Sequence, residues 1–114
     1  MINSETTAAI LRFRRERDWE QFHSPRNLAM AISIEAAELL EPFRWCSDKD
    51  VEQVVESCKE AIVDEVADMV ILLTYLTNDL SIDLEEAIAS KLAANASKYP
   101  IEKFRGSSKK YSQS

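Results

Sequence analysis

Apolar residues recur at helical spacing along most of this chain, with polar residues between them. The pattern predicts four helices: from Asn3 or Ser4 to about Arg17, from Pro25 to about Trp45, from Val51 to about Asn78, and from an Asp83 cap to between Asn95 and Lys98. Ser24 and Pro25 form a capped start to the second helix, Pro42 bends or ends it, and Pro100 follows the fourth. We therefore expect an all-α fold with a four-helix core.

The composition supports this prediction. The chain has 114 residues, with a single glycine, Gly106, and three prolines at predicted helix ends. Neither a P-loop nor a dinucleotide fingerprint can be written without several glycines, so any bound phosphate must be held by metals or side chains. We expect one domain over residues 1–114, with residues 1–3 and 106–114 flexible.

The charge of the chain limits its partners. Twenty acidic residues against 14 basic ones give a formal net charge of −6, which makes duplex nucleic acid a poor partner. No apolar run approaches the roughly 18 residues of a membrane span, and no signal-peptide core is visible. Cys46 and Cys58 fit neither a disulfide framework nor a zinc site, so we expect ordinary thiols and a cytoplasmic protein.

Two acidic motifs interrupt the most apolar parts of the second and third predicted helices. Glu35 and Glu38 form an ExxE motif, and Glu65 and Asp68 form an ExxD motif. Carboxylates three residues apart share one helix face, so two such helices packed together would bring four negative charges to one place. The ordinary alternative is that these are solvated residues or members of weak surface ion pairs. Their apolar surroundings favour metal ligation instead.

Oxygen ligands of this kind indicate Mg²⁺ or Mn²⁺. A di-iron bundle would need a glutamate followed three residues later by histidine on each of two helices, and the one histidine, His23, does not fit that pattern. Mg²⁺ usually shares its coordination with substrate phosphates, so the motifs favour a metal-bound polyphosphate.

Aromatic residues supply a second set of candidates. Trp19, Phe22, His23 and Trp45 carry aromatic rings that could stack on a flat ring of a ligand. They could equally be hydrophobic packing or a subunit interface, and His23 could make a structural hydrogen bond. Lys91, Asn95 and Lys98 lie at i, i+4 and i+7 on one helix face. This face could contact a ligand, or it could be an ordinary solvated surface.

The chain resembles the MazG-like all-α nucleoside triphosphate pyrophosphohydrolases, and within them the dCTP pyrophosphatase branch. The resemblance rests on the ExxE and ExxD motifs together with residues 17–28, 43–45, 90–100, 105–108 and 110–111. It covers nearly the whole chain from about residue 10.

The resemblance implies Mg²⁺-dependent hydrolysis of a deoxynucleoside triphosphate, with dCTP or a modified dCTP as the first expectation, to a monophosphate and pyrophosphate in nucleotide-pool cleaning. It also implies a homotetramer. The implied metal ligands and catalytic residues are Glu35, Glu38, Glu65 and Asp68, with Glu38 the one expected to orient or deprotonate water. The residues implied to enclose and bind the nucleotide are His23, Trp19, Trp45, Lys91, Asn95 and Lys98.

Three alternatives stay open at this point: a pyrophosphohydrolase of broad specificity, a nucleotide-binding sensor without turnover, and a structural helical oligomer. The chain also departs from the pattern of its relatives. Leu72 stands four residues after Asp68, where relatives often carry tyrosine, and Tyr75 follows nearly one turn later; Asp64 stands where a glutamate often precedes the ExxD motif.

Overall fold

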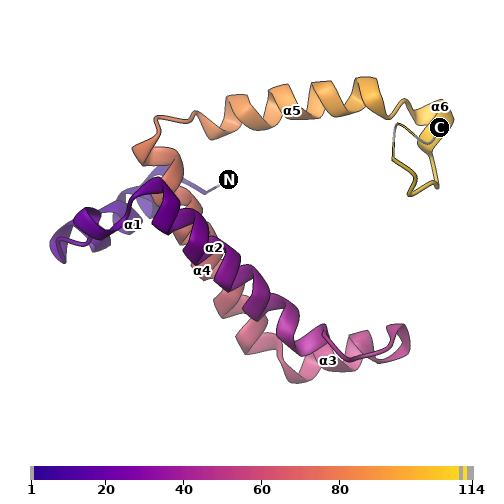
Figure 1. The fold of residues 1–114 in the computed structure, drawn as a ribbon, viewed down its shortest axis with the longest axis horizontal. Helices are drawn as coiled ribbons and strands as arrows, with labels where there is room; N and C mark the ends of the chain where they lie inside the picture. Colours follow the sequence, from indigo (N-terminus) through magenta and orange to yellow (C-terminus); the bar gives the residue numbers. More distant parts are fainter. Residues whose placement is uncertain (1, 111, 113–114) are drawn as a thin grey trace. The chain divides into compact units, whose positions relative to one another are not determined.

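The structure is a computed structural model that describes residues 2–110 and 112. Every regular element of the described residues is helical, which confirms the predicted all-α class. The elements are α1 (Ser4–Glu16), η1 (Glu20–Phe22), α2 (Pro25–Leu40), η2 (Glu41–Phe43), η3 (Asp48–Asp50), α3 (Val51–Ser57), α4 (Lys59–Asp79), α5 (Leu84–Lys98) and α6 (Ile101–Phe104). They form two units, one from Ile2 to Ser81 and one from Ile82 onward, and each is described by itself (Figure 1).

Side-chain caps begin three of the helices, as the sequence predicts. The capping bonds run from the N–H groups of Thr6, Asn27 and Glu86 to the side chains of Asn3, Ser24 and Asp83, at 2.8, 3.1 and 3.1 Å. Each bond satisfies a backbone donor that has no partner inside its helix. The starts of α1, α2 and α5 are therefore determined locally.

The second helix ends earlier than predicted. The α-helix stops at Leu40, and the next turn, η2, is a 3₁₀ turn that contains Pro42. Proline has no N–H to donate, and its ring clashes with the carbonyl four residues earlier, so a regular helix cannot continue through it. Trp45 consequently lies beyond the end of the helix.

The third predicted helix is broken into α3 and α4. Cys58 separates them with φ −112° and ψ 17°, outside helical values. Ser57, the last residue of α3, turns its hydroxyl back to donate to the carbonyl of Gln53 at 2.8 Å. Serine and cysteine are mediocre helix formers, and a hydroxyl bonded to the preceding turn often bends a helix, which accounts for the break.

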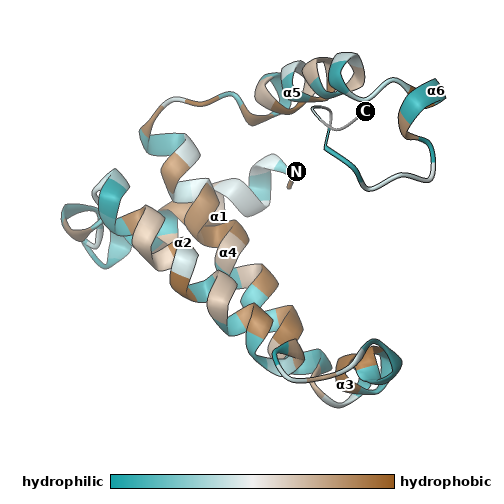
Figure 2. Cartoon of the chain, turned by 45° about the vertical axis from the view of Figure 1, so that its right-hand side comes forward, coloured by the Kyte–Doolittle hydropathy of each residue, from teal (hydrophilic) through white to brown (hydrophobic). Residues whose placement is uncertain are grey.

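The first unit is built on the packing of α2 along α4, with α1 and α3 also against α4 (Figure 1). Among the described residues, the buried hydrophobic side chains are Leu28 and Tyr75. Apolar residues on α2 and α4 alternate with polar ones around each helix, as Figure 2 shows. Much of the apolar surface of these helices therefore stays outside the core of a single chain.

The predictions of one domain over residues 1–114 and of flexible ends stay predictions. Flexibility of residues 1–3 and 106–114 falls partly on residues 1, 111, 113 and 114, which lie outside the described residues. The described helices include none that is long and apolar enough to cross a bilayer.

An ion pair joins α1 to the end of α4. The two guanidinium NH groups of Arg14 donate to the two carboxylate oxygens of Asp79 at 2.8 and 2.7 Å. Arg14 is buried, with 2% of its surface exposed, whereas the Asp79 side chain is 27% exposed. These hydrogen bonds lower the pKa of Asp79 and raise that of Arg14.

Replacing Asp79 with asparagine will lower the free energy of unfolding by about 2–3 kcal/mol at pH 7, because the buried guanidinium loses its counter-charge. Urea unfolding followed by circular dichroism measures the change, with the exposed Asp48→Asn as the control. Since the pKa of Asp79 is lowered on folding, its contribution is complete above about pH 5 and is lost as the pH falls below about 4. A difference between wild type and variant that stayed constant from pH 7 to pH 3 would contradict this assignment.

Candidate active site

Three carboxylates meet where α2 packs on α4. Glu35, Glu38 and Glu65 each place one oxygen within 4.8 Å of the others. Glu35 and Glu65 are half-buried, and Glu38 is exposed. The ExxE spacing puts the first two on one face of α2, and α4 supplies the third from the opposite side. The helix packing therefore collects like charges from two separate motifs.

The cluster found among the described residues consists of acidic side chains alone. Glu35 Oε2 and Glu65 Oε2 are buried and have no hydrogen-bond partner among the described residues. Hydrogen bonding to Glu35, the desolvation of Glu65 and hydrogen bonding to Glu38 raise the pKa of Glu65 to about 8. Buried carboxylate oxygens without donors are what a divalent cation would satisfy, so this donor set fits a hard metal ion.

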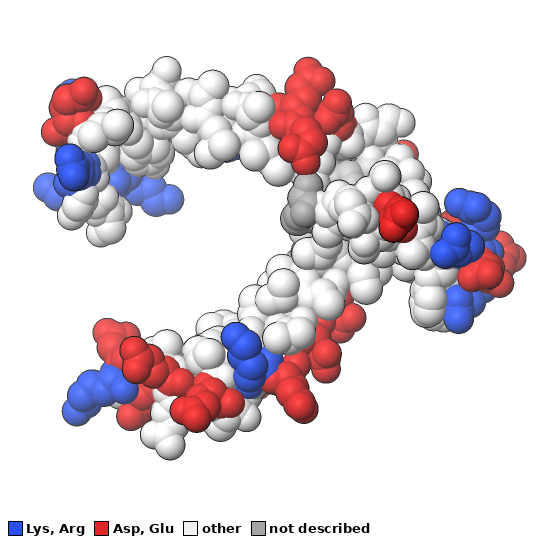
Figure 3. Space-filling view, turned by 180° about the vertical axis from the view of Figure 1, so that it is seen from behind, with Lys and Arg blue, Asp and Glu red and all other residues white. Residues whose placement is uncertain are grey.

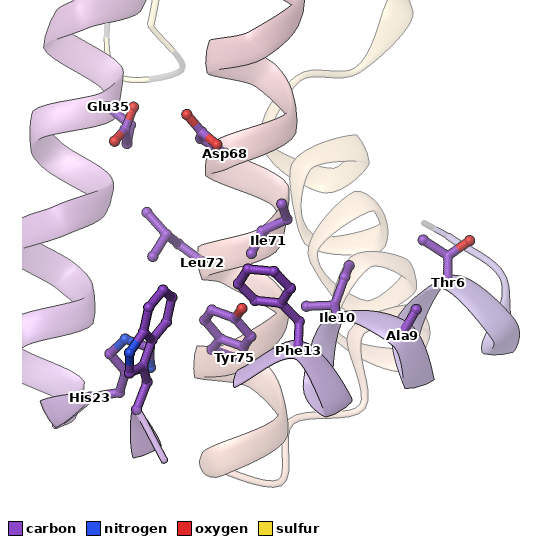
Figure 4. Close-up of a pocket in the computed structure, with 11 residues that line it drawn as sticks. Thr6, Ala9, Ile10, Phe13, His23, Glu35, Asp68, Ile71, Leu72 and Tyr75 are labelled. Carbon is purple, nitrogen blue, oxygen red and sulfur yellow. The ribbon is translucent and has the colours of Figure 1, made fainter. Parts of the chain in front are cut away.

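Asp68 lies one turn beyond Glu65 on α4, as the ExxD spacing predicts. It is not part of the three-carboxylate cluster found among the described residues, but it lines a pocket together with Glu35. Figure 4 shows the side chains of Glu35 and Asp68 facing each other across the gap between α2 and α4. One end of the pocket is therefore acidic.

The pocket has a volume of about 530 Å³ and lies within the first unit. A cavity of that size can hold a ligand with the dimensions of a nucleotide. Its walls come from α1, the η1 segment, α2 and α4, and the lining residues are Thr6, Ala9, Ile10, Phe13, Trp19, His23, Glu35, Asp68, Ile71, Leu72 and Tyr75 (Figure 4).

Aromatic rings gather at the end of the pocket away from the acidic pair (Figure 4). Phe13 and Trp19 make a T-shaped pair with centroids 5.7 Å apart, and His23 stacks on Tyr75 at 5.2 Å. Burial, and then the charge of Arg14, lower the pKa of His23. The imidazole is therefore neutral at pH 7 and presents a flat, uncharged ring.

The predicted site residues divide into those that reach this pocket and those that do not. Trp19 and His23 line it together with Glu35 and Asp68. Trp45 is not one of the lining residues: it is 83% exposed, and the guanidinium of Arg44 lies 4.9 Å from the centre of its ring. Lys91, Asn95 and Lys98 are carried by α5 in the second unit. Their roles in binding stay predictions.

Sequence reasoning missed part of the pocket wall. The first helix reads as a packing helix, but its Thr6, Ala9, Ile10 and Phe13 line the cavity. Tyr75 also lines it, and here a signal was available, because Tyr75 follows Asp68 by seven residues and so lies two turns along the same face of α4. The pairing of Arg14 with Asp79 left no local signal.

Surface charge explains why a polyphosphate would need a cation here. Figure 3 shows Asp and Glu gathered around α3 and the start of α4 in the first unit, with few Lys or Arg among them. The exposed acidic residues of this region are Asp48, Asp50, Glu52, Glu56, Glu60 and Asp64. Phosphates approaching the carboxylate cluster would be repelled unless positive charge lay between them.

The chain is similar in sequence to a known family and to several named proteins. A sequence model of the MazG-like family matches residues 30–113. The chain is 43% identical over 101 residues to dCTP pyrophosphatase 1 from Mus musculus, covering 87% of this chain and 59% of that protein. It is 41% identical over 103 residues to dCTP pyrophosphatase 1 from Homo sapiens, covering 89% and 61%. The chain thus spans about three fifths of the length of these relatives.

A solved structure is also similar. The crystal structure of a pyrophosphatase from Archaeoglobus fulgidus matches with a TM-score of 0.81 and 40% sequence identity. The match covers 84% of this chain and 90% of that one.

At pH 9, above the pKa of Glu65 of about 8, replacing Glu65 with glutamine will raise the melting temperature of the metal-free protein, because it removes one charge from a cluster of three. The same variant will lose the increase in melting temperature that MgCl₂ or MnCl₂ gives the wild type, since a cation stabilises only the state that binds it. Differential scanning calorimetry with and without EDTA measures both effects. Glu56→Gln, an exposed change of the same charge on α3, is the control, and an unchanged metal response in Glu65→Gln would remove Glu65 from the metal site.

Proposed function

Since the chain belongs to the MazG-like family, we propose that it is a nucleoside triphosphate pyrophosphohydrolase. Water attacks a deoxynucleoside triphosphate, the bond between the α and β phosphates breaks, and a monophosphate and pyrophosphate leave. The observation that carries the proposal is one pocket with an acidic end beside a carboxylate cluster and an aromatic end opposite it. That arrangement suits the two chemical parts of a nucleotide.

The proposed metal ligands are Glu35, Glu38, Glu65 and Asp68, and the proposed ion is Mg²⁺, with Mn²⁺ able to replace it. The donor set supports this, because it consists of oxygens alone and leaves two buried oxygens unsatisfied. When bound, the ion supplies neutralisation of the phosphates and activation of water. Glu38, the exposed member of the cluster, is the carboxylate we assign to orienting the water or accepting its proton.

The proposed substrate is dCTP or a modified dCTP, and the proposed role is nucleotide-pool cleaning. This follows the relatives named dCTP pyrophosphatase 1. Trp19 and His23 line the aromatic end and are assigned to the base. We assign Lys91, Asn95 and Lys98 to phosphates and sugar, and Trp45 to a further contact with the nucleotide, on the resemblance of their sequence segments to the dCTP pyrophosphatase branch.

A broader substrate range is the second candidate function. Ring stacking accepts any base, because every base has a flat π face. The structure favours it through the lining of the base end, where Phe13, Trp19, His23 and Tyr75 are aromatic and Ile10, Ile71 and Leu72 are aliphatic. Such a wall has few groups that could read the edge of one base.

We also propose a homo-oligomer, a tetramer by family resemblance, in which residues 1–114 form one domain with a four-helix core. Support comes from large apolar side chains of the first unit that are exposed: Trp45, Phe22 and Leu40 are 83, 62 and 58% exposed. A monomeric protein rarely exposes many large apolar side chains, and contact between copies of this chain would cover them. Cys46 and Cys58 are free thiols, which supports a cytoplasmic location.

Incubating the purified protein with MgCl₂ and each common dNTP and NTP, and with 5-methyl-dCTP, will give a nucleoside monophosphate and pyrophosphate, identified by ³¹P NMR. Chelation with EDTA will stop the reaction. A monophosphate released together with two molecules of orthophosphate would contradict cleavage between the α and β phosphates. Binding of nucleotides without any product would favour the sensor hypothesis, and neither binding nor turnover would favour a structural oligomer.

Glu38→Gln and Asp68→Asn will each lower kcat by at least about 100-fold while the far-ultraviolet circular dichroism spectrum stays the same. Both side chains are exposed, so losing the charge disturbs metal binding rather than packing. Steady-state kinetics measures the effect, with Glu56→Gln again matching the loss of one negative charge. Normal turnover in either variant would exclude that residue from the metal site.

A further inference from the structure

Arg14 occupies a buried position that an apolar side chain could also fill. It is 2% exposed, and its pairing with Asp79 offsets the cost of removing the guanidinium from water. Buried ion pairs are often no more stabilising than apolar side chains of the same volume. A contribution to stability is therefore an incomplete explanation for an arginine at this position.

The contacts of Arg14 point toward the pocket. Its guanidinium carbon lies 4.5 Å from the centre of the Tyr75 ring, and the other stacking partner of that ring is His23. Tyr75 and His23 line the pocket, whereas Arg14 and Asp79 do not. The ion pair thus sits behind the wall and is connected to it through Tyr75.

We infer that the Arg14–Asp79 pair is a positioning element that holds Tyr75 and His23 as a preformed wall for the nucleoside part of the substrate. This rests on the proposed function. Tyr75 is only 4% exposed, so its ring is already fixed by its neighbours before any ligand arrives. A wall ordered in advance spares the ligand the cost of ordering it, and that saving appears as affinity.

The geometry places the effect of the Arg14–Asp79 pair at the aromatic end of the pocket, away from the carboxylates. Tyr75 follows Asp68 by seven residues, which separates the two positions by about 10 Å along α4. In Figure 4, Glu35 and Asp68 lie at one end of the pocket, and His23 and Tyr75 lie at the other. Loosening the Tyr75 ring should weaken binding of the nucleoside and leave the binding of phosphates as it is.

Arg14→Met tests the inference, because methionine keeps the aliphatic packing and leaves behind only Asp79, which water can reach. We expect KM for dCTP to rise about tenfold with kcat changed less than about twofold, a loss of uniform binding. Inhibition by inorganic tripolyphosphate, which has phosphates and no nucleoside, should keep its Ki. Arg12→Met, an exposed arginine on the same helix, is the matched control and should change neither constant.

A double-mutant cycle separates positioning from simple support of the fold. Tyr75→Leu should raise KM by itself, and Arg14→Met should add little in that background, because Arg14 acts through the tyrosine ring. Should Arg14→Met fail to fold, Arg14→Lys keeps the charge but loses the two-pronged contact with Asp79, and KM should then rise by a smaller factor.

Three results would overturn the inference: an unchanged KM in folded Arg14→Met or Arg14→Lys, an equal loss of affinity for dCTP and tripolyphosphate, or full additivity with Tyr75→Leu. Measurements on the wild-type protein distinguish a failure of the proposed function from a failure of this inference. A wild-type protein that neither binds nor hydrolyses any nucleotide overturns the proposed function and this inference together. A wild type that turns over normally beside unaffected variants overturns the inference alone.

Discussion

The packing of α2 along α4 is the interaction on which the rest of the first unit depends. It forces Glu35, Glu38 and Glu65 to within 4.8 Å of one another, an arrangement that electrostatic repulsion opposes. The apolar contacts between the two helices must therefore offset that repulsion when no cation is bound. The pKa of Glu65 is raised to about 8 by the same crowding, because a protonated Glu65 is not repelled by the carboxylates of Glu35 and Glu38.

The pocket has an acidic end and an aromatic end, which lie at different positions along α4. The acidic end is built from i, i+3 pairs that a metal ion can join, and the aromatic end is built from rings contributed by α1, the η1 segment and α4. In the proposed function, chemistry at the phosphates and recognition of the nucleoside would thus use different residues and different forces.

Local sequence signals predicted the parts of this structure that are determined locally. Caps at Asn3, Ser24 and Asp83 fix helix starts through neighbouring N–H groups, and the two acidic motifs fix which faces carry the carboxylates. The break at Cys58 was missed because the apolar periodicity continues through it. The pairing of Arg14 with Asp79 was missed for a different reason, since a partner 65 residues away leaves no trace in a local pattern.

That separation of 65 residues has a consequence for how the pocket forms. Bringing distant residues together costs loop entropy that nearby contacts do not, and α1 can dock only where α4 is already in place. The carboxylate cluster needs only α2 and α4, whereas the wall of Tyr75 and His23 is completed by the first helix. During folding the carboxylate cluster would be assembled before the wall of Tyr75 and His23. If the proposed function holds, local unfolding of α1 would weaken binding of the nucleoside more than binding of a metal ion.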